Sequence, residues 1–175
     1  MDVRGADISQ AALWGGILSA IFAVMQFLFA PTLGNLSDRF GRSPVLLTST
    51  LVAAFDYILL AVAGPIWLLL IGRIIGGVTA ATQSTASAFM ADISPREKKA
   101  QNFGLIGAAF GVGFVLGPVI GGLLGELGPR APFYAAALMA GLNFIFVYFV
   151  LPETVTEGKR RPLSWSRANP VGSFK

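Results

Sequence analysis

Two charged residues interrupt stretches of this sequence that are otherwise apolar. Asp56 lies among hydrophobic residues, and Arg73 lies in the next apolar stretch. A charge in the middle of a membrane helix costs at least about 2.5–3.5 kcal/mol, so such a group usually faces a partner or a cavity. At about 1.5 Å per residue, the two charges reach a similar depth in adjacent antiparallel helices. They predict either a pair that only locks two helices together or a cavity-facing pair that handles a substrate or a proton.

A lone amide, Gln26, lies in the preceding apolar stretch. It can bond to a neighbouring helix or orient a polar ligand at the wall of a cavity. The sequence has no Cys and no His, which excludes disulfides, Cys/His metal sites and Cys- or His-dependent catalysis. One Asp with one Arg offers no reaction mechanism, so we predict that the protein is not an enzyme.

The densest polar segment is 34–46, between two apolar stretches. It holds two glycines and three charged residues: Gly34, Asp38, Arg39, Gly41 and Arg42. The glycines allow tight turns, and Ser43-Pro44 has the form of an N-cap followed by proline at the first helical position, so a helix should begin at Pro44. Asp92 ends a later apolar stretch on the same side. Asp38, Arg42 and Asp92 could therefore form a charge-assisted cluster.

Small residues form a third pattern, in the fourth apolar stretch. Glycines recur at every fourth position, which places them on one helix face: Gly113, Gly117, Gly121 and Gly125. The run 117–122 adds Pro118 and Gly122, and proline removes a helix hydrogen bond and bends the helix. We expect a close helix neighbour along this face, and a simple packing role is the alternative interpretation.

The composition indicates which elements position these residues. The chain has 175 residues, of which 54% are hydrophobic and 13% charged, and its mean hydropathy is +0.69; these values are typical of a membrane protein. We predict an all-α bundle over residues 1–152 with five membrane spans, each about 20 residues long. The predicted spans are 11–33, 45–63, 66–91, 103–124 and 132–151.

Two further features follow the third and fifth spans. Ser94-Pro95-Arg96-Glu97 has the form of a capping box, so a helix should begin at Pro95. Residues 153–175 are polar and basic, and they contain no membrane span of their own. Basic residues flank the spans and do not form a stripe with stacking aromatics, so no nucleic-acid partner is expected.

The distribution of basic residues predicts the orientation, because Lys and Arg near helix ends favour the cytoplasm. Of the 13 bases, Arg73 lies inside a span and Arg4 and Arg130 lie on one side. The other side holds the remaining ones: Arg39, Arg42, Arg96, Lys98, Lys99, Lys159, Arg160, Arg161, Arg167 and Lys175. We therefore expect the N-terminus outside and the C-terminus in the cytoplasm.

The segment 34–46 resembles the signature G-x-L-[AS]-D-[RK]-x-G-[RK]-[RK]-x-x-[LI] between the second and third helices of major facilitator superfamily transporters. Seven positions match in register: Gly34, Leu36, Asp38, Arg39, Gly41, Arg42 and Leu46. Ser43 departs, because a second base is usual there. An ordinary positive loop between two membrane helices is the alternative reading of this segment.

Two more segments resemble signatures of drug/proton antiporters in this superfamily. Gly117-Pro118-Val119-Ile120-Gly121-Gly122 is similar to G-P-x-x-G-G on the fifth helix, and Leu69 with Arg73 is similar to the fourth-helix signature, with Gly76 where glutamine is common. With the segments 26–31, 55–57 and 131–134 included, the chain resembles bacterial tetracycline/proton antiporters from end to end.

This resemblance implies roles for the residues described above. Gln26, Asp56 and Arg73 would line a path for substrate and proton. A second group would form a gate on the cytoplasmic side: Gly34, Asp38, Arg39, Gly41, Arg42 and Asp92. Within this gate, Asp38, Arg42 and Asp92 would form the charge cluster. It further implies a multi-pass protein of the bacterial inner membrane, with the proton as coupling ion, no other cofactor, and the drug carried as a magnesium chelate.

The number of spans also carries an expectation. A half of such a transporter resembles a bundle of six helices, so the chain is interpreted as a fragment covering helices two to six. By the same resemblance, residues 153–175 would be the start of a basic central cytoplasmic loop. Its partners would be the lipid bilayer, the drug, protons, and the first helix and C-terminal half of the same transporter, and it would be inactive alone. The alternatives are an exporter of another amphipathic drug and a truncated membrane module without transport activity.

Overall fold

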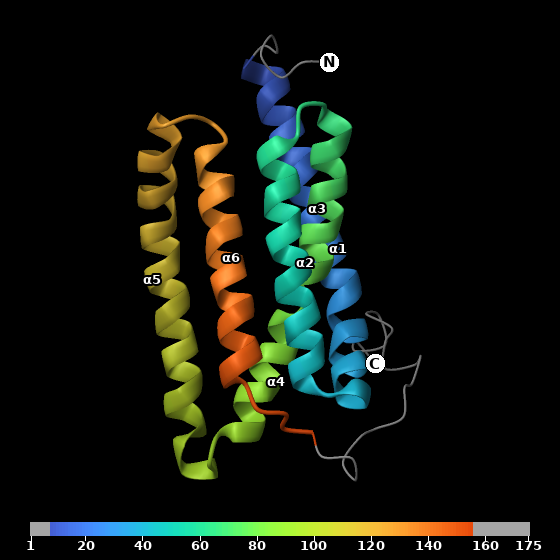
Figure 1. The fold of residues 1–175 in the computed structure, drawn as a ribbon, viewed down its shortest axis with the longest axis vertical. Helices are drawn as coiled ribbons and strands as arrows, with labels where there is room; N and C mark the ends of the chain where they lie inside the picture. Colours follow the sequence, from blue (N-terminus) through green and yellow to red (C-terminus); the bar gives the residue numbers. More distant parts are fainter. Residues whose placement is uncertain (1–7, 156–175) are drawn as a thin grey trace.

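A computed structural model describes residues 8–155 and contains, within that range, helices joined by short turns. Five helical stretches are long and apolar enough to cross a membrane. These five stretches run alternately up and down the long axis of the bundle (Figure 1). The elements are α1 (Ile8–Phe40), α2 (Arg42–Val62), α3 (Ile66–Ala80), α4 (Gln83–Ile93), a 3-10 turn η2 (Arg96–Lys98), α5 (Lys99–Glu126) and α6 (Ala131–Val150). The predicted all-α membrane bundle is confirmed.

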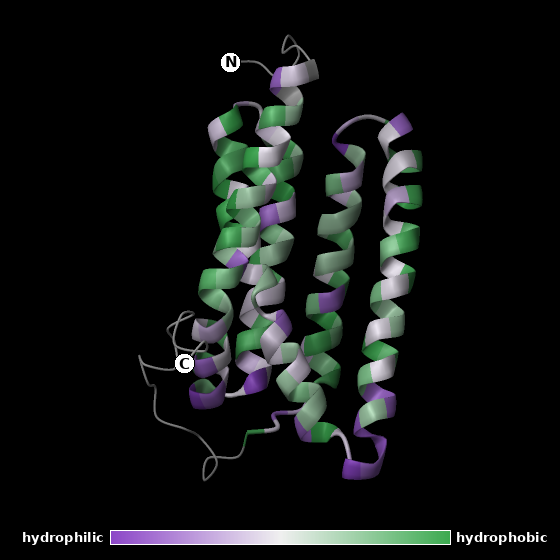
Figure 2. Cartoon of the chain, turned by 180° about the vertical axis from the view of Figure 1, so that it is seen from behind, coloured by the Kyte–Doolittle hydropathy of each residue, from purple (hydrophilic) through white to green (hydrophobic). Residues whose placement is uncertain are grey.

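Helices α1, α2 and α3 form one group, and α6 packs along α2, with α5 at the edge of the bundle (Figure 1). The start of α1 and the turns 63–65 and 127–130 lie at one end of the bundle. The break at Gly41, the turn before α5 and the end of α6 lie at the other end, which we call the charged end. Polar residues gather at the two ends and apolar residues along the helices (Figure 2).

A small apolar core connects α2, α4 and α6 near the charged end. Leu46, Phe89 and Val147 are buried together there, and Leu47 and Leu151 pack against them. Helices α1 and α3 approach each other closely at Gly77, where an added Cβ would be only 2.6 Å from the carbonyl oxygen of Phe22. A glycine is therefore required at this crossing.

The predicted boundary between the first two helices is wrong. Helix α1 does not end near Leu33 but continues to Phe40, and α2 begins at Arg42, before Pro44. Gly41 alone separates them, with φ of 110°, a conformation that favours glycine. Polar side chains outside the hydrocarbon are compatible with helix, so the polarity of this segment did not mark a loop. Ser43 does not cap α2, because its hydroxyl donates to the Leu151 carbonyl at 3.1 Å.

The third predicted helix is broken, which the sequence analysis did not predict. Helix α3 ends at Ala80 and α4 begins at Gln83. At the break the Thr82 amide bonds to the Thr79 carbonyl at 3.1 Å, in the tighter 3-10 pattern. Thr79 also bonds its hydroxyl to the carbonyls of Ile75 and Gly76. Such side-chain bonds compete with regular helix geometry.

The predicted capping box at the start of the next helix is also wrong. Ser94 ends α4, and no side chain caps the 3-10 turn that follows Pro95. The Ser94 hydroxyl instead accepts a hydrogen bond from the Asn102 amide at 2.7 Å. Helix α5 therefore begins at Lys99. Of the predicted basic segment 153–175, only Glu153 to Val155 lie within the described residues.

Candidate functional site

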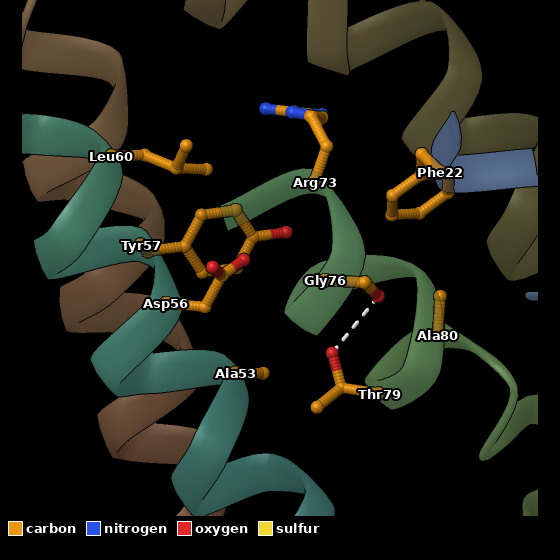
Figure 3. A pocket seen from close by; sticks show the side chains of 9 residues that line it. All are labelled: Phe22, Ala53, Asp56, Tyr57, Leu60, Arg73, Gly76, Thr79 and Ala80. Atoms are coloured by element: carbon orange, nitrogen blue, oxygen red, sulfur yellow. Dashed lines mark hydrogen bonds between the residues drawn. The ribbon is translucent and has the colours of Figure 1, made fainter. Parts of the chain in front are cut away.

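A cavity of about 150 Å³ lies among α1, α2 and α3, inside the predicted membrane region. Figure 3 shows its lining from close by. Helix α1 contributes one aromatic residue, while α2 and α3 contribute the charged residues predicted from the sequence. The lining residues are Phe22, Ala53, Asp56, Tyr57, Leu60, Arg73, Gly76, Thr79 and Ala80. The structure thus brings Asp56 and Arg73 to one cavity.

Asp56 is 5% exposed, and among residues 8–155 its Oδ1 atom has no hydrogen-bond partner. Its carboxylate lies against α3 at two glycines. A Cβ on Gly72 would lie 3.1 Å from Oδ1, and a Cβ on Gly76 would lie 2.8 Å from Oδ2. An unpaired buried carboxylate is costly unless it gains a proton or a partner. The arrangement therefore suits a group that exchanges a proton or binds a polar ligand.

Arg73 does not form the direct ion pair with Asp56 that equal depth suggested. No nitrogen of Arg73 lies within 4.0 Å of a carboxylate oxygen in the described part of the chain. Its guanidinium lies 5.9 Å from the centroid of the Phe22 ring, in cation–π geometry. Figure 3 shows its side chain reaching over the cavity, while Asp56 points toward the turn of α3 that contains Gly76. The predicted depth is correct, but the direct contact is absent because the two side chains point in different directions.

Gln26 is not among the residues that line this cavity. It is half-buried on α1, one turn after Phe22, and Phe22 occupies the position on α1 that faces Arg73. The predicted grouping of Gln26 with Asp56 and Arg73 is therefore not formed around this cavity. Phe22, Tyr57 and Thr79 contribute to the lining instead. Tyr57 lies in the segment 55–57 that carries part of the family resemblance, but no role had been predicted for any of the three.

The second group of predicted residues meets at the charged end. Arg42 donates from Nη1 to Asp38 Oδ1 at 2.7 Å and from Nε to Asp92 Oδ2 at 3.1 Å. The same Nη1 donates to the Ser37 hydroxyl at 2.7 Å. The Arg42 side chain is only 12% exposed. We call Asp38, Arg42 and Asp92 the charged cluster; its predicted contacts are present, and they join the ends of α1, α2 and α4.

The other predicted gate residues lie around this cluster with different surroundings. Arg39 is exposed and stacks over the ring of Phe40 at 5.2 Å, outside the cluster. Gly34 lies where α1 passes α4, with the Ser84 hydroxyl 3.8 Å from an added Cβ. Gly41 forms the break between α1 and α2.

The motif on α5 lies apart from both sites. Pro118 is inside the continuous helix α5, and among the described residues nothing lies within 4 Å of a Cβ added to Gly117, Gly121 or Gly122. The same holds for Gly113 and Gly125. The close neighbour expected along this face is therefore not supplied by residues 8–155.

No role was predicted for Glu153, which was described only as the first residue of the polar segment 153–175. The Glu153 carboxylate accepts hydrogen bonds from the backbone amides of Arg42 at 3.0 Å and Ser43 at 3.2 Å. Two features of the sequence could have indicated this contact. Glu153 follows the end of α6, and α2, which begins at the same end of the bundle, has no acidic residue in its first turn.

Comparisons with known proteins place these features in a family. The family model of the Major Facilitator Superfamily matches residues 3–174. The tetracycline resistance protein, class C, of Escherichia coli is 51% identical over 160 residues, which cover 91% of this chain and 40% of that protein. The class B protein of Escherichia coli is 46% identical over 139 residues, covering 79% of this chain and 35% of that protein.

A solved structure is also similar. The human organic anion transporter MFSD10 (TETRAN) has a TM-score of 0.77 and 35% sequence identity, covering 85% of this chain and 34% of that chain. The present chain thus spans 35–40% of the length of these two curated relatives. With the match over residues 3–174 and the five membrane-length helices, this chain belongs to the Major Facilitator Superfamily.

Proposed function

We propose that this chain forms part of a proton-coupled efflux transporter for a tetracycline-like drug. The observation that carries the proposal is the buried carboxylate of Asp56, which has one unpartnered oxygen and lines a cavity between membrane helices. A carboxylate in low dielectric is a suitable proton carrier, because a proton removes its uncompensated charge. The drug class comes from the relatives, which are named for tetracycline resistance.

In this proposal the charged cluster is the cytoplasmic gate. Two carboxylates bound to one guanidinium form strong, charge-assisted contacts. Alternating access requires a contact of this kind that is formed in one state and broken in the other, with the two states differing by a few kcal/mol in free energy. The gate closes the cytoplasmic side, and its opening admits the drug while a proton moves in the opposite direction. The glycine face of α5 packs against further helices of the same transporter.

The remaining partners follow from this assignment. The protein spans the inner membrane of a bacterium, with the start of α1 outside and the charged end in the cytoplasm. The drug is carried as a magnesium chelate, the proton is the coupling ion, and no chemical step, further cofactor or nucleic acid is involved. Since the chain spans 35–40% of the length of the two tetracycline resistance proteins, additional helices of the transporter complete the substrate path.

The proton-carrier role is tested with Asp56→Asn in a full-length transporter that contains this chain. Asparagine keeps the size of the side chain but cannot exchange the proton. We expect proton-driven drug uptake into inverted vesicles to fall at least about tenfold, because the coupling step is lost. Glu126→Gln, at the exposed end of α5, is the matched control and should pump at the parental rate. Normal pumping by the Asp56→Asn protein would contradict the proposal.

The gate is tested separately with Asp38→Asn in the same transporter. Asparagine keeps the polarity but removes the charge that Arg42 contacts at 2.7 Å. We expect normal membrane abundance, retained drug binding and severely reduced uptake into inverted vesicles. If these vesicles pump at the parental rate, the charged segment is only a topological anchor.

A second candidate function is export of another amphipathic compound, such as an organic anion. It is favoured by the similarity to the human organic anion transporter, at 35% identity, and by Arg73 in the cavity wall. A competition assay separates the two candidates: tetracycline should block uptake of a fluorescent probe drug, whereas an excess of simple organic anions should not. The reverse result would favour the second candidate.

A further inference from the structure

The chain immediately after α6 lies across the start of α2. We call residues 151–155 the strap. Glu153 Oε1 accepts from the Arg42 amide at 3.0 Å, and Glu153 Oε2 accepts from the Ser43 amide at 3.2 Å. The first amides of a helix have no partner within the helix, and α2 has no side-chain cap from its own N-cap residue, Gly41. The cap of α2 is therefore supplied by a residue more than one hundred positions away in the sequence.

The strap is itself held in a defined conformation. Glu153 Oε1 also accepts from the Val155 amide at 2.8 Å, so three backbone N–H groups surround one carboxylate. The Ser43 hydroxyl donates to the Leu151 carbonyl at 3.1 Å. A carboxylate is favoured at this place because the N-terminus of a helix carries a partial positive charge.

Gly41 is matched to this contact. A Cβ added to Gly41 would overlap Oε2 and the carboxyl carbon of Glu153 and would lie 3.1 Å from Oε1. Its φ of 110° also disfavours any residue with a side chain. The glycine therefore allows the sharp break between α1 and α2 and leaves the space that the Glu153 carboxylate occupies.

The strap contacts two residues of the charged cluster, Arg42 and Asp92. Arg42 is held through its backbone amide by Glu153 and through its side chain by Asp38 and Asp92. The Thr154 hydroxyl donates to Asp92 Oδ2 at 3.3 Å, the same oxygen that Arg42 contacts. A movement of α6 relative to α2 would therefore disturb both the cap and the cluster.

We propose that Glu153 is a positioning residue of the charged cluster: by capping α2 it fixes Arg42 in the place where Asp38 and Asp92 can both bind it. The inference rests on the proposed gate function of the cluster. The strap then transmits the position of α6 to the gate, so the end of α6 and the cluster open together.

The test uses a full-length, cysteine-free transporter that contains this chain, with one cysteine introduced at Ala53 in the cavity wall. A membrane-impermeant thiol reagent is applied from the cytoplasmic side in inverted vesicles. Glu153→Gln should raise the labelling rate about three- to tenfold, because a charge-assisted cap is lost and the closed gate is weakened. Glu97→Gln, an exposed acid at the same end of the bundle, is the matched control and should leave the rate unchanged.

A double variant separates positioning from a general loss of stability. If Glu153 acts through the cluster, Glu153→Gln combined with Asp38→Asn should label at the same rate as Asp38→Asn alone. If the increases in labelling rate of the two single variants multiply in the double variant, the positioning role is overturned. It is also overturned if lower membrane abundance explains the effect of Glu153→Gln. A response to Asp38→Asn without any response to Glu153→Gln would overturn this inference alone. No response to Asp38→Asn in labelling or uptake would overturn the gate itself.

Discussion

Asp56 turns its carboxylate toward α3 at the two positions where that helix has no side chain. Gly72 and Gly76 leave the space for its two oxygens, at 3.1 and 2.8 Å from the places where a Cβ would be. Arg73 lies one turn from Gly76 but is engaged with Phe22. Glycine at these two positions makes room for the Asp56 carboxylate, and its Oδ1 atom has no hydrogen-bond partner among residues 8–155. The carboxylate is therefore available to a proton or a ligand.

This geometry predicts that Gly76→Ala destabilises the protein. The added methyl would overlap the Asp56 carboxylate, and overpacking of this kind costs about 1–3 kcal/mol. Thermal unfolding of the purified full-length transporter measures the effect. Gly16→Ala, where nothing lies within 4 Å, is the control and should unfold at the parental temperature.

A second substitution identifies the cause of that destabilisation. Asp56→Ala in the Gly76→Ala background removes the overlapping oxygens, so the unfolding temperature should recover although transport stays lost. If stability does not recover, the clash lies with another neighbour, of which Phe22 is the nearest at 3.5 Å.

At the scale of elements, the bundle is held by a few close crossings and by polar contacts at its ends. Helix α3 touches the backbone of α1 at Gly77, and the apolar core of Leu46, Phe89 and Val147 joins α2, α4 and α6. The break at Ala81–Thr82 lies between these two contacts. Helix α3 therefore packs against α1, while α4 contributes to the apolar core near the charged end. Small residues at crossings are the usual means of packing helices in membranes.

The crossing of α1 and α3 predicts a strong effect of Gly77→Ala. A methyl 2.6 Å from the Phe22 carbonyl oxygen cannot be relieved by rotating a side chain, because the neighbour is backbone. We expect the two helices to separate and membrane abundance of the full-length transporter to fall several-fold. Gly141→Ala on α6, which meets nothing within 4 Å, should leave abundance unchanged, and equal abundance of both variants would show that the crossing tolerates a methyl group.

For the whole molecule, the distribution of charge between its two ends predicts the orientation. At the charged end the described residues include five bases: Arg39, Arg42, Arg96, Lys98 and Lys99. The opposite end has Arg130. Basic residues close to membrane helices favour the cytoplasmic side, so the charged end should face the cytoplasm.

Single cysteines test this orientation in a cysteine-free transporter. Phe40 is 52% exposed at the charged end and Leu127 is 79% exposed at the other, so both positions accept a thiol reagent. Phe40→Cys should react only with reagent applied to the cytoplasmic side, and Leu127→Cys only with reagent applied outside. Ser43→Cys would be a poor probe, because Ser43 is 8% exposed. Reaction of both cysteines from the same side would contradict the predicted topology.

The sequence by itself determined the number of membrane helices and the Asp38–Arg42 contact of the charged cluster. Hydrocarbon of fixed thickness requires about 20 apolar residues per span, so length and hydropathy alone reveal five spans. Asp38 and Arg42 lie four residues apart, and spacing of this kind brings side chains together wherever the chain is nearly helical. Their contact at 2.7 Å therefore followed from local sequence.

Only the tertiary structure decided how distant segments meet. Three features depend on how the helices are rotated and shifted against one another. They are the separation of Arg73 from Asp56, the absence of Gln26 from the cavity wall, and the cap that Glu153 places on α2. Packing of whole helix faces fixes these rotations, at positions such as Gly77 where one backbone touches another. No short pattern in the sequence records such a contact, because its two sides lie on different helices.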